Sequence, residues 1–176
     1  IALSGNEAQK EKYLPKLASG EFLGAYSLSE AGSGTDAAAM VAKATDDGDC
    51  YTLNGEKMWV TNGTTADLFV LFAKVTDHPD YGKKSHGGVT CFIIEKGFEG
   101  FEIGKKEDKL GIRSSDTCTL ILNNCKVPKE NVLGEVGKGF PIAMNALDNS
   151  RIGIAAQGLG IAQGAYETAL KYSRER

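Results

Sequence analysis

The sequence predicts an α+β chain that is mainly β, in which a closed barrel or a sandwich is flanked by a short N-terminal helix and one long C-terminal helix. Between residues 22 and 132, short apolar or alternating runs are separated by turn signals rich in Gly, Asn and Asp. Seven or eight strands at this spacing are typical of a barrel or sandwich and not of a parallel sheet. Before residue 20 and after residue 136, apolar residues recur at helical spacing.

Composition excludes several classes of protein. The chain has 176 residues, 41% of them hydrophobic, and a formal net charge of −3 with basic and acidic residues interspersed. This favours one domain with a core, with pieces of neighbouring domains, and neither nucleic acid nor a membrane as partner. No apolar run approaches the roughly 20 residues that span a bilayer, and no signal-peptide pattern occurs. We expect a soluble intracellular protein.

The cysteines and histidines form no pattern typical of a metal site. No C-x-x-C pair occurs, and both histidines lie in one polar loop. We expect no bound metal, and we expect the cysteines to be reduced and mostly buried. The residues concerned are Cys50, Cys91, Cys118, Cys125, His78 and His86.

Residues 6–17 predict a helix with a sparse apolar face and a stop at Gly20. Its apolar face comprises Ala8, Tyr13, Leu14 and Leu17. The chain begins without Met, in what reads as the middle of an element. We therefore expect a piece of a longer protein, in which residues 1–21 end a preceding helical domain.

The predicted strands follow in sequence and are separated by turns. They cover residues 22–29, 40–45, 50–53, 57–61, 67–75, 88–95, 101–103 and 117–122. Asn54-Gly55 is the strongest hairpin signal, because both residues tolerate the positive φ of a tight turn. The charged loop 76–86 contains Pro79 and Gly82, so we expect it to be solvated and mobile.

The stretch from Tyr26 to Asp36 combines a short strand with a glycine-rich turn. Residues Tyr26, Ser27, Leu28 and Ser29 alternate as a strand would, and Gly32 and Gly34 then follow among Ser33 and Thr35. Such a turn exposes backbone N–H groups to a large anion, and its hydroxyls add donors suited to phosphate or a heterocyclic carbonyl. An ordinary surface turn between strands is the alternative reading.

Residues 57–61 place an aromatic ring and a hydroxyl on one face. Strand alternation directs Lys57, Trp59 and Thr61 to one side and Met58 and Val60 to the other. The indole could stack on a planar ring while the hydroxyl donates a hydrogen bond. Spacing alone equally allows an ordinary core Trp beside a Thr at a strand end.

Several motifs together resemble the acyl-CoA dehydrogenases. They are Leu-Ser-Glu-Ala-Gly-Ser-Gly-Thr-Asp at 28–36, Leu-Asn-Gly-Glu-Lys-Met-Trp-Val-Thr-Asn at 53–62 and Gly-Lys-Lys-Glu-Asp-Lys-Leu-Gly-Ile-Arg at 104–113. Val-Pro-Lys-Glu-Asn-Val-Leu-Gly at 127–134 and Leu-Asp-Asn-Ser-Arg at 147–151 follow in the family's order. The run 104–113, with the residues from Arg151 onward, most resembles the short-chain, butyryl-CoA dehydrogenase branch.

The resemblance implies a middle β-barrel domain, residues 22–133, in an FAD enzyme. The stretch Tyr26 to Thr35 would hold the edge of the flavin ring and the pyrophosphate. The stretch Trp59, Val60 and Thr61 would supply the indole that packs on the isoalloxazine and the hydroxyl near its reactive N5. Thr35 would also touch the CoA thioester.

Residues 137–176 predict one long helix with a single apolar stripe. The stripe consists of Met144, Leu147, Ile154, Ile161, Ala165, Ala169 and Tyr172. The resemblance implies that residues 134–176 open a C-terminal bundle of four helices. Asp148 and Arg151 could form an exposed ion pair; in the family, the residues matching Asp148, Asn149, Ser150 and Arg151 contact CoA.

The family's reaction removes a proton α to a thioester and passes a hydride from the β carbon to flavin N5. The base is normally a Glu kept away from water, and a minority of members place it where this chain has Ser150. We therefore expect no catalytic base in this chain, no activity from the chain alone, and weak FAD binding. The resemblance also implies an electron-transfer flavoprotein as acceptor and a homotetramer for the full-length protein.

Two other functions use the same fold. A flavin-dependent oxidase or monooxygenase would share the barrel motifs, and rapid reoxidation by oxygen would favour it. A non-catalytic module that binds FAD or an acyl chain would keep the barrel as well. The CoA-facing motif 148–151 argues against the module.

Overall fold

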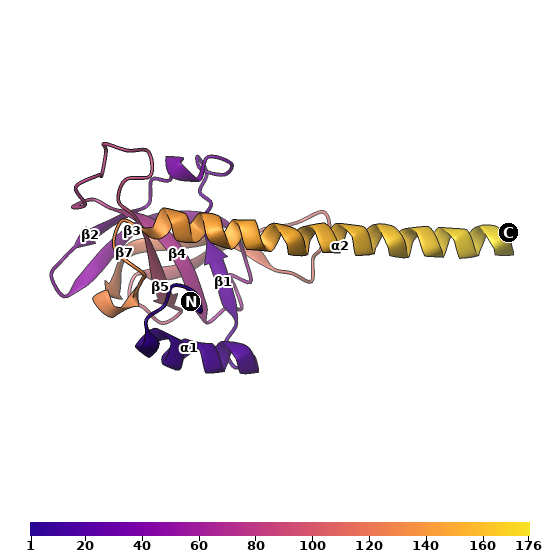
Figure 1. Ribbon diagram of the computed structural model, residues 1–176, viewed down its shortest axis with the longest axis horizontal. Coiled ribbons are helices and arrows are strands. Elements are labelled where there is room, and N and C mark those ends of the chain that lie inside the picture. The colour runs from indigo at the N-terminus through magenta and orange to yellow at the C-terminus, as the bar shows by residue number, and fades with distance from the viewer. The chain divides into compact units, whose positions relative to one another are not determined.

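The structure is a computed structural model that describes residues 1–176 (Figure 1). The chain divides into two compact units, residues 1–142 and residues 143–176. The first unit contains the N-terminal helix and all the strands, and most of the long C-terminal helix forms the second.

One eight-stranded sheet dominates the first unit and confirms the mainly β prediction. Its strands are β1 (Gly24–Ser27), β2 (Lys43–Asp46), β3 (Cys50–Thr61), β4 (Leu68–Val75), β5 (Val89–Glu95), β6 (Phe101–Lys106), β7 (Thr117–Pro128) and β8 (Val132–Leu133). The hydrogen-bonded order is β6-β7-β3-β2-β4-β5-β8, and β1 pairs with β4 off this path. The path ends at β6 and β8, so the hydrogen-bonded ladder itself does not close into a ring.

The main hydrophobic cluster lies on one face of this sheet and collects side chains from β1 to β7, while Phe72, Cys91 and Ile93 are buried on the other face. Two aromatic contacts lie within the cluster: Tyr51 meets Phe92 edge-on at 5.4 Å, and Phe69 meets Phe101 at 4.7 Å. Antiparallel ladders join β3 to β7 and β4 to β5, whereas β1 and β2 run parallel to β4. Strands β4 and β5 are buried along nearly their whole length, whereas the second half of β7 alternates between exposed and buried residues. This explains why the sequence shows continuous apolar runs in the first case and alternation in the second.

The hairpin predicted at Asn54-Gly55 is wrong. The runs 50–53 and 57–61 form the single strand β3, and the two residues lie where its pairing with β7 shifts register. Asn124 of β7, at φ 51°, donates its N–H to Asn54 Oδ1 at 2.9 Å. Gly55 has φ 144°, and a Cβ placed there would lie 2.9 Å from Ala42 Cα. The positive φ therefore serves a β-bulge and a close backbone approach instead of a turn.

Helix α1 (Glu7–Ser19) begins at the predicted place, because Asn6 and Gln9 form a reciprocal capping box. It ends at Gly20, whose φ of 77° gives the expected left-handed cap. The side chain of Tyr13 is buried, but Ala8, predicted on the same face, is exposed.

Polar contacts dock α1 on the sheet. Gln9 Nε2 donates to the carbonyls of Glu130 and Val132 at 2.7 and 2.8 Å. The Tyr13 hydroxyl donates to Glu95 Oε1 at 2.7 Å and accepts from Asn131 Nδ2 at 3.2 Å. These hydrogen bonds add to the predicted apolar face, of which Tyr13 is buried and Leu14 and Leu17 are half-buried.

Helix α2 (Gly139–Glu175) confirms the long helix, with 37 residues. Ile154, Ile161 and Tyr172 of the predicted stripe are 67%, 64% and 59% exposed. None of the helices is long and apolar enough to cross a membrane. The cysteines are free thiols, and Cys91, Cys118 and Cys125 are buried.

The docking of α1 is expected to weaken in acid. Burial alone would raise the pKa of Glu95, but hydrogen bonds from Lys12 and Tyr13 outweigh it and hold that pKa below its ordinary value. The carboxylate therefore stabilises the fold above its unfolded pKa of about 4.3, and this contribution is lost as pH falls through the lower folded value. We expect Glu95→Gln to cost about 1–2 kcal/mol of unfolding free energy at neutral pH, and much less below about pH 4.

Urea denaturation at both pH values would measure this difference. Glu102→Gln is the matched control, because Glu102 is exposed, and it should change little at either pH. An equal cost of Glu95→Gln at both pH values would contradict the assignment.

The bulge at Gly55 is expected to be intolerant of a side chain. Gly55→Ala places a Cβ against Ala42 at a φ that side chains rarely adopt, and we expect a loss of about 1–3 kcal/mol. Gly97→Ala is the control, because a Cβ there would meet nothing within 4 Å. Thermal unfolding of the two variants would compare them, and equal melting temperatures would contradict the prediction.

Candidate functional site

The glycine-rich stretch forms a tight turn fixed by its own backbone. Glu30 and Ser33 exchange both backbone hydrogen bonds, at 3.0 and 3.1 Å. The buried Ser33 hydroxyl donates to the Asp36 carbonyl at 2.9 Å, and Asp36 Oδ1 accepts from Ala38 N–H at 3.1 Å. This last contact caps a short 3-10 helix, η1 (Ala37–Ala39).

The outer side of this turn is open. Gly32 and Gly34 are exposed, and a Cβ at either would meet nothing within 4 Å. Neither has the positive φ that requires glycine, so their small size leaves space without relieving backbone strain. The N–H groups of Gly32, Gly34 and Thr35 donate to no carbonyl of the chain. Free donors beside open space are what an anion needs.

The turn is held against β3 by a buried ion pair. Lys57 Nζ lies 2.6 Å from Glu30 Oε1, and the two side chains are 0% and 4% exposed. Lys57 also donates to the Leu28 carbonyl at 3.1 Å. Burial lowers the pKa of Lys57, and the neighbouring Glu30 carboxylate opposes that shift.

Sequence reasoning missed this pair and placed Lys57 on the face of Trp59, which is wrong. A second bulge inserts one extra residue into β3 between Lys57 and Val60, which pair with Leu120 and Cys118 of β7. Lys57 and Val60 therefore both face the core. A lysine within an apolar strand indicates a possible buried charge. Its partner Glu30 is 27 positions away in the sequence, so local patterning did not connect the two.

The same bulge turns Trp59 outward. Its φ is 55°, and its side chain is 60% exposed. Thr61 is exposed as well, whereas Val60 is 1% exposed and belongs to the core. Met58 N–H donates to the Ser29 carbonyl at 2.9 Å, which links this bulge to the glycine-rich turn. The structure thus brings the turn close to the bulge that carries Trp59.

The remaining members of the predicted flavin set are more enclosed. Tyr26 is half-buried with its ring edge-on to Phe72 at 5.4 Å, and burial raises its pKa. Leu28 is buried, so with Val60 it could reach a ligand only through its backbone. The Ser27 hydroxyl is buried without a hydrogen-bond partner.

These features fit a flavin. An uncovered indole can pack on a planar ring, the Thr61 hydroxyl lies on the exposed side of β3, and the free N–H groups suit a pyrophosphate.

The predicted substrate residues of α2 lie in the second unit and are all exposed. Arg151 Nη1 is 3.5 Å from Asp148 Oδ1, so the predicted ion pair forms. Asn149 Nδ2 donates to the Asn145 carbonyl at 2.8 Å, and the Ser150 hydroxyl donates to the Leu147 carbonyl at 2.9 Å. An exposed pair of this kind contributes little to stability.

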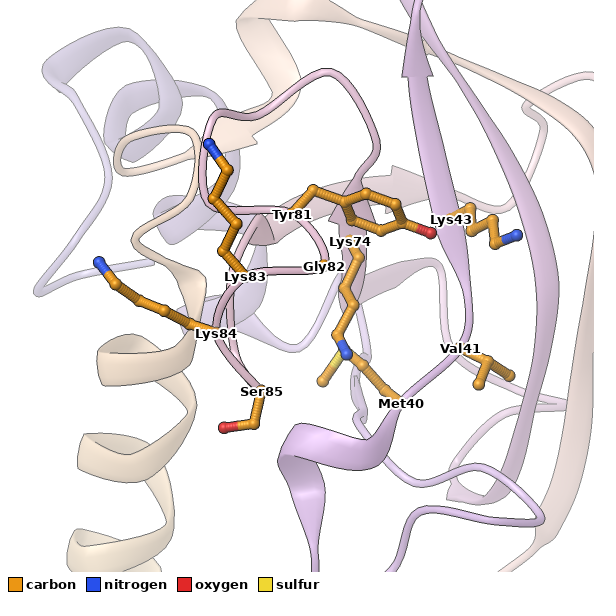
Figure 2. Close-up of a pocket in the computed structure, with 9 residues that line it drawn as sticks. All are labelled: Met40, Val41, Lys43, Lys74, Tyr81, Gly82, Lys83, Lys84 and Ser85. Atoms are coloured by element: carbon orange, nitrogen blue, oxygen red, sulfur yellow. The ribbon is translucent and has the colours of Figure 1, made fainter.

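A separate hollow of about 440 Å³ contains none of the predicted flavin or CoA residues (Figure 2). Tyr81 reaches across it, while the ammonium groups of Lys83 and Lys84 point away from it. The Lys74 ammonium donates to the Ala38 carbonyl at 2.9 Å and so steadies η1. The predicted site is therefore an open surface and not this hollow.

Comparison with known proteins identifies related chains. Residues 25–125 match the family model "Acyl-CoA dehydrogenase, middle domain", and residues 137–176 match "Acyl-CoA dehydrogenase, C-terminal domain". A short-chain specific acyl-CoA dehydrogenase of Clostridium acetobutylicum is 54% identical over 98% of this chain and 44% of its own length. The chain thus spans less than half the length of this curated relative.

Solved structures agree with the sequence matches. Butyryl-CoA dehydrogenase from Megasphaera elsdenii is 51% identical with a TM-score of 0.94, over 100% of this chain and 45% of its own. An acyl-CoA dehydrogenase from Bacillus anthracis, solved in complex with FAD, is 47% identical with a TM-score of 0.72, over 80% of this chain and 23% of its own. The chain belongs to the acyl-CoA dehydrogenase family.

Proposed function

We propose that this chain is part of an FAD-dependent acyl-CoA dehydrogenase that oxidises short-chain acyl-CoA thioesters to trans-2-enoyl-CoA. The observation that supports it most directly is the outward Trp59, held on a bulge beside a turn with free N–H donors. The short-chain preference is supported by the names of the Clostridium and Megasphaera relatives.

In this proposal the glycine-rich turn and the Trp59 bulge hold FAD, as the complex of the Bacillus relative suggests. Trp59 packs on the isoalloxazine, Thr61 provides a hydroxyl beside it, and the backbone of residues 26–29 lines the ring edge. The N–H groups of Gly32, Gly34 and Thr35, with the Ser33 segment, bind the pyrophosphate. Bound FAD would supply the hydride acceptor of the reaction.

The acyl-CoA is proposed to contact Thr35 of the first unit and Asp148, Asn149, Ser150 and Arg151 of the second. The guanidinium of Arg151 is planar and positively charged, and it can donate paired hydrogen bonds to phosphate or carbonyl oxygens. Its exposed partner Asp148 can be displaced at little cost, because a surface ion pair is worth under about 1 kcal/mol.

The catalytic base is proposed to lie in a part of the full-length enzyme outside this chain. Residues 1–21, 22–133 and 134–176 would then belong to three domains, with the exposed apolar stripe of α2 covered by further helices. We also propose an electron-transfer flavoprotein as acceptor, a homotetramer, and a cytoplasmic or mitochondrial-matrix location.

The activity can be tested by anaerobic visible spectroscopy of the full-length protein. Adding butyryl-CoA should bleach the flavin band, because the reaction delivers two electrons to the cofactor. The isolated chain of 176 residues should cause no turnover, because in this proposal the base lies outside it. Bound flavin that no acyl-CoA bleaches would contradict the dehydrogenase proposal, and bleaching followed by rapid reoxidation in air would indicate an oxidase.

The role of Trp59 can be tested separately from activity. Trp59→Ala removes the stacking surface and should weaken FAD binding to the full-length protein on the order of 10-fold, whereas Trp59→Phe should retain most of the affinity. Leu3→Ala is the matched control, because Leu3 is 81% exposed and lies outside the predicted site. Fluorescence titration of apoprotein with FAD gives the affinities, and equal affinity in all three variants would exclude a flavin contact.

A further inference from the structure

The pair of Glu30 and Lys57 differs from every other ion pair in the protein. In each of the others, both side chains are at least 32% exposed, whereas here they are 4% and 0% exposed. Removing two charges from water is unfavourable, and a buried ion pair is often no more stabilising than apolar side chains of the same size. Stability alone therefore does not explain why the core contains it.

Each charged group of the pair also binds backbone. Besides Lys57, the Glu30 carboxylate accepts the N–H of Val41 at 2.6 Å and the N–H of Ala42 at 3.2 and 3.3 Å. Lys57 donates its second hydrogen bond to the Leu28 carbonyl at 3.1 Å. The pair therefore joins three segments: the entry to the glycine-rich turn, the exit from η1 and strand β3.

These contacts lie beside the hydrogen bond that joins the two parts of the proposed flavin site, the glycine-rich turn and the bulge that carries Trp59. Leu28 and Glu30 flank Ser29, whose carbonyl accepts the N–H of Met58 at 2.9 Å. Lys57 and Met58 lead directly into Trp59, which stands at a φ of 55°. One hydrogen-bonded cluster thus fixes both the start of the turn and the start of the bulge.

We propose that Glu30 and Lys57 are positioning residues of the flavin site, which set the distance between the glycine-rich turn and Trp59. The inference rests on the proposed function, because it concerns the same site. Neither side chain reaches the ligand itself, since both are enclosed by the core. Their effect on FAD is transmitted through Ser29 and Met58.

A purely structural pair and a positioning pair predict different results. A structural pair affects only how readily the protein unfolds, so folded variants should bind FAD as the parent does. A positioning pair affects the geometry of the folded site, so folded variants should bind FAD more weakly and hold the ring differently.

The test uses the full-length protein with the double variant Glu30→Gln/Lys57→Met, which keeps the side-chain volumes and removes both charges together. The apoprotein is first checked by urea denaturation. Its FAD dissociation constant and the visible circular dichroism of the bound flavin are then measured. We expect the affinity for FAD to fall on the order of 10-fold, which is the lower end of the loss seen when residues that orient metal ligands are substituted. The visible circular dichroism spectrum of the bound flavin should change as well.

Two further variants keep the test decisive. Glu30→Asp keeps both charges, so neither is left unpaired in the core, and it should fold even if the double variant does not. Its shorter side chain changes the spacing of the pair, and its FAD affinity should fall by a smaller factor. Lys126→Met is the matched control, because it breaks an exposed pair with Asp47 on the other side of β3 and should leave FAD binding unchanged.

The possible failures are distinguishable. If the folded variants bind FAD with the parent's affinity and visible dichroism, the positioning role is excluded while the proposed function stands. If the unmodified full-length protein binds no FAD, the proposed function itself fails.

Discussion

The contact between the Lys57 ammonium and the Glu30 carboxylate is the interaction on which the arrangement of this protein's candidate site depends. It is short, enclosed, and completed by backbone groups from two segments, the entry to the glycine-rich turn and the exit from η1. An ammonium or a carboxylate left alone in this core would be strongly destabilising, so each group requires the other in place. The glycine-rich turn and strand β3 are consequently held together whether or not a ligand is present.

Two β-bulges give the sheet its functional shape. At one, Gly55 lets the backbone approach Ala42; at the other, the inserted residue sends Lys57 and Val60 inward and Trp59 outward. A regular strand would have buried or exposed Lys57 and Trp59 together. The bulge therefore produces two features at once: a charge in the core that anchors the turn, and an aromatic ring on the surface.

Two separate features of this chain bear on its function: its family and the exposed groups around Trp59. Matches over residues 25–125 and 137–176 place the chain in the acyl-CoA dehydrogenase family. The fold presents a large exposed indole on a strained backbone, next to unused N–H donors and an unsatisfied buried hydroxyl at Ser27. Soluble proteins seldom leave such groups in one place unless a ligand covers them.

The sequence by itself determined the class of the fold, the two flanking helices, most strands and the family, because these depend on local periodicity, capping residues and short motifs. It also indicated Trp59, Thr61 and the glycine-rich turn as candidates. It could not show that Asn54-Gly55 lies inside a strand, that Lys57 faces the core, or that Ala8 is exposed. Those outcomes were decided by tertiary structure, because a bulge arises from the register between strands and a buried charge is tolerated only where a partner distant in sequence meets it.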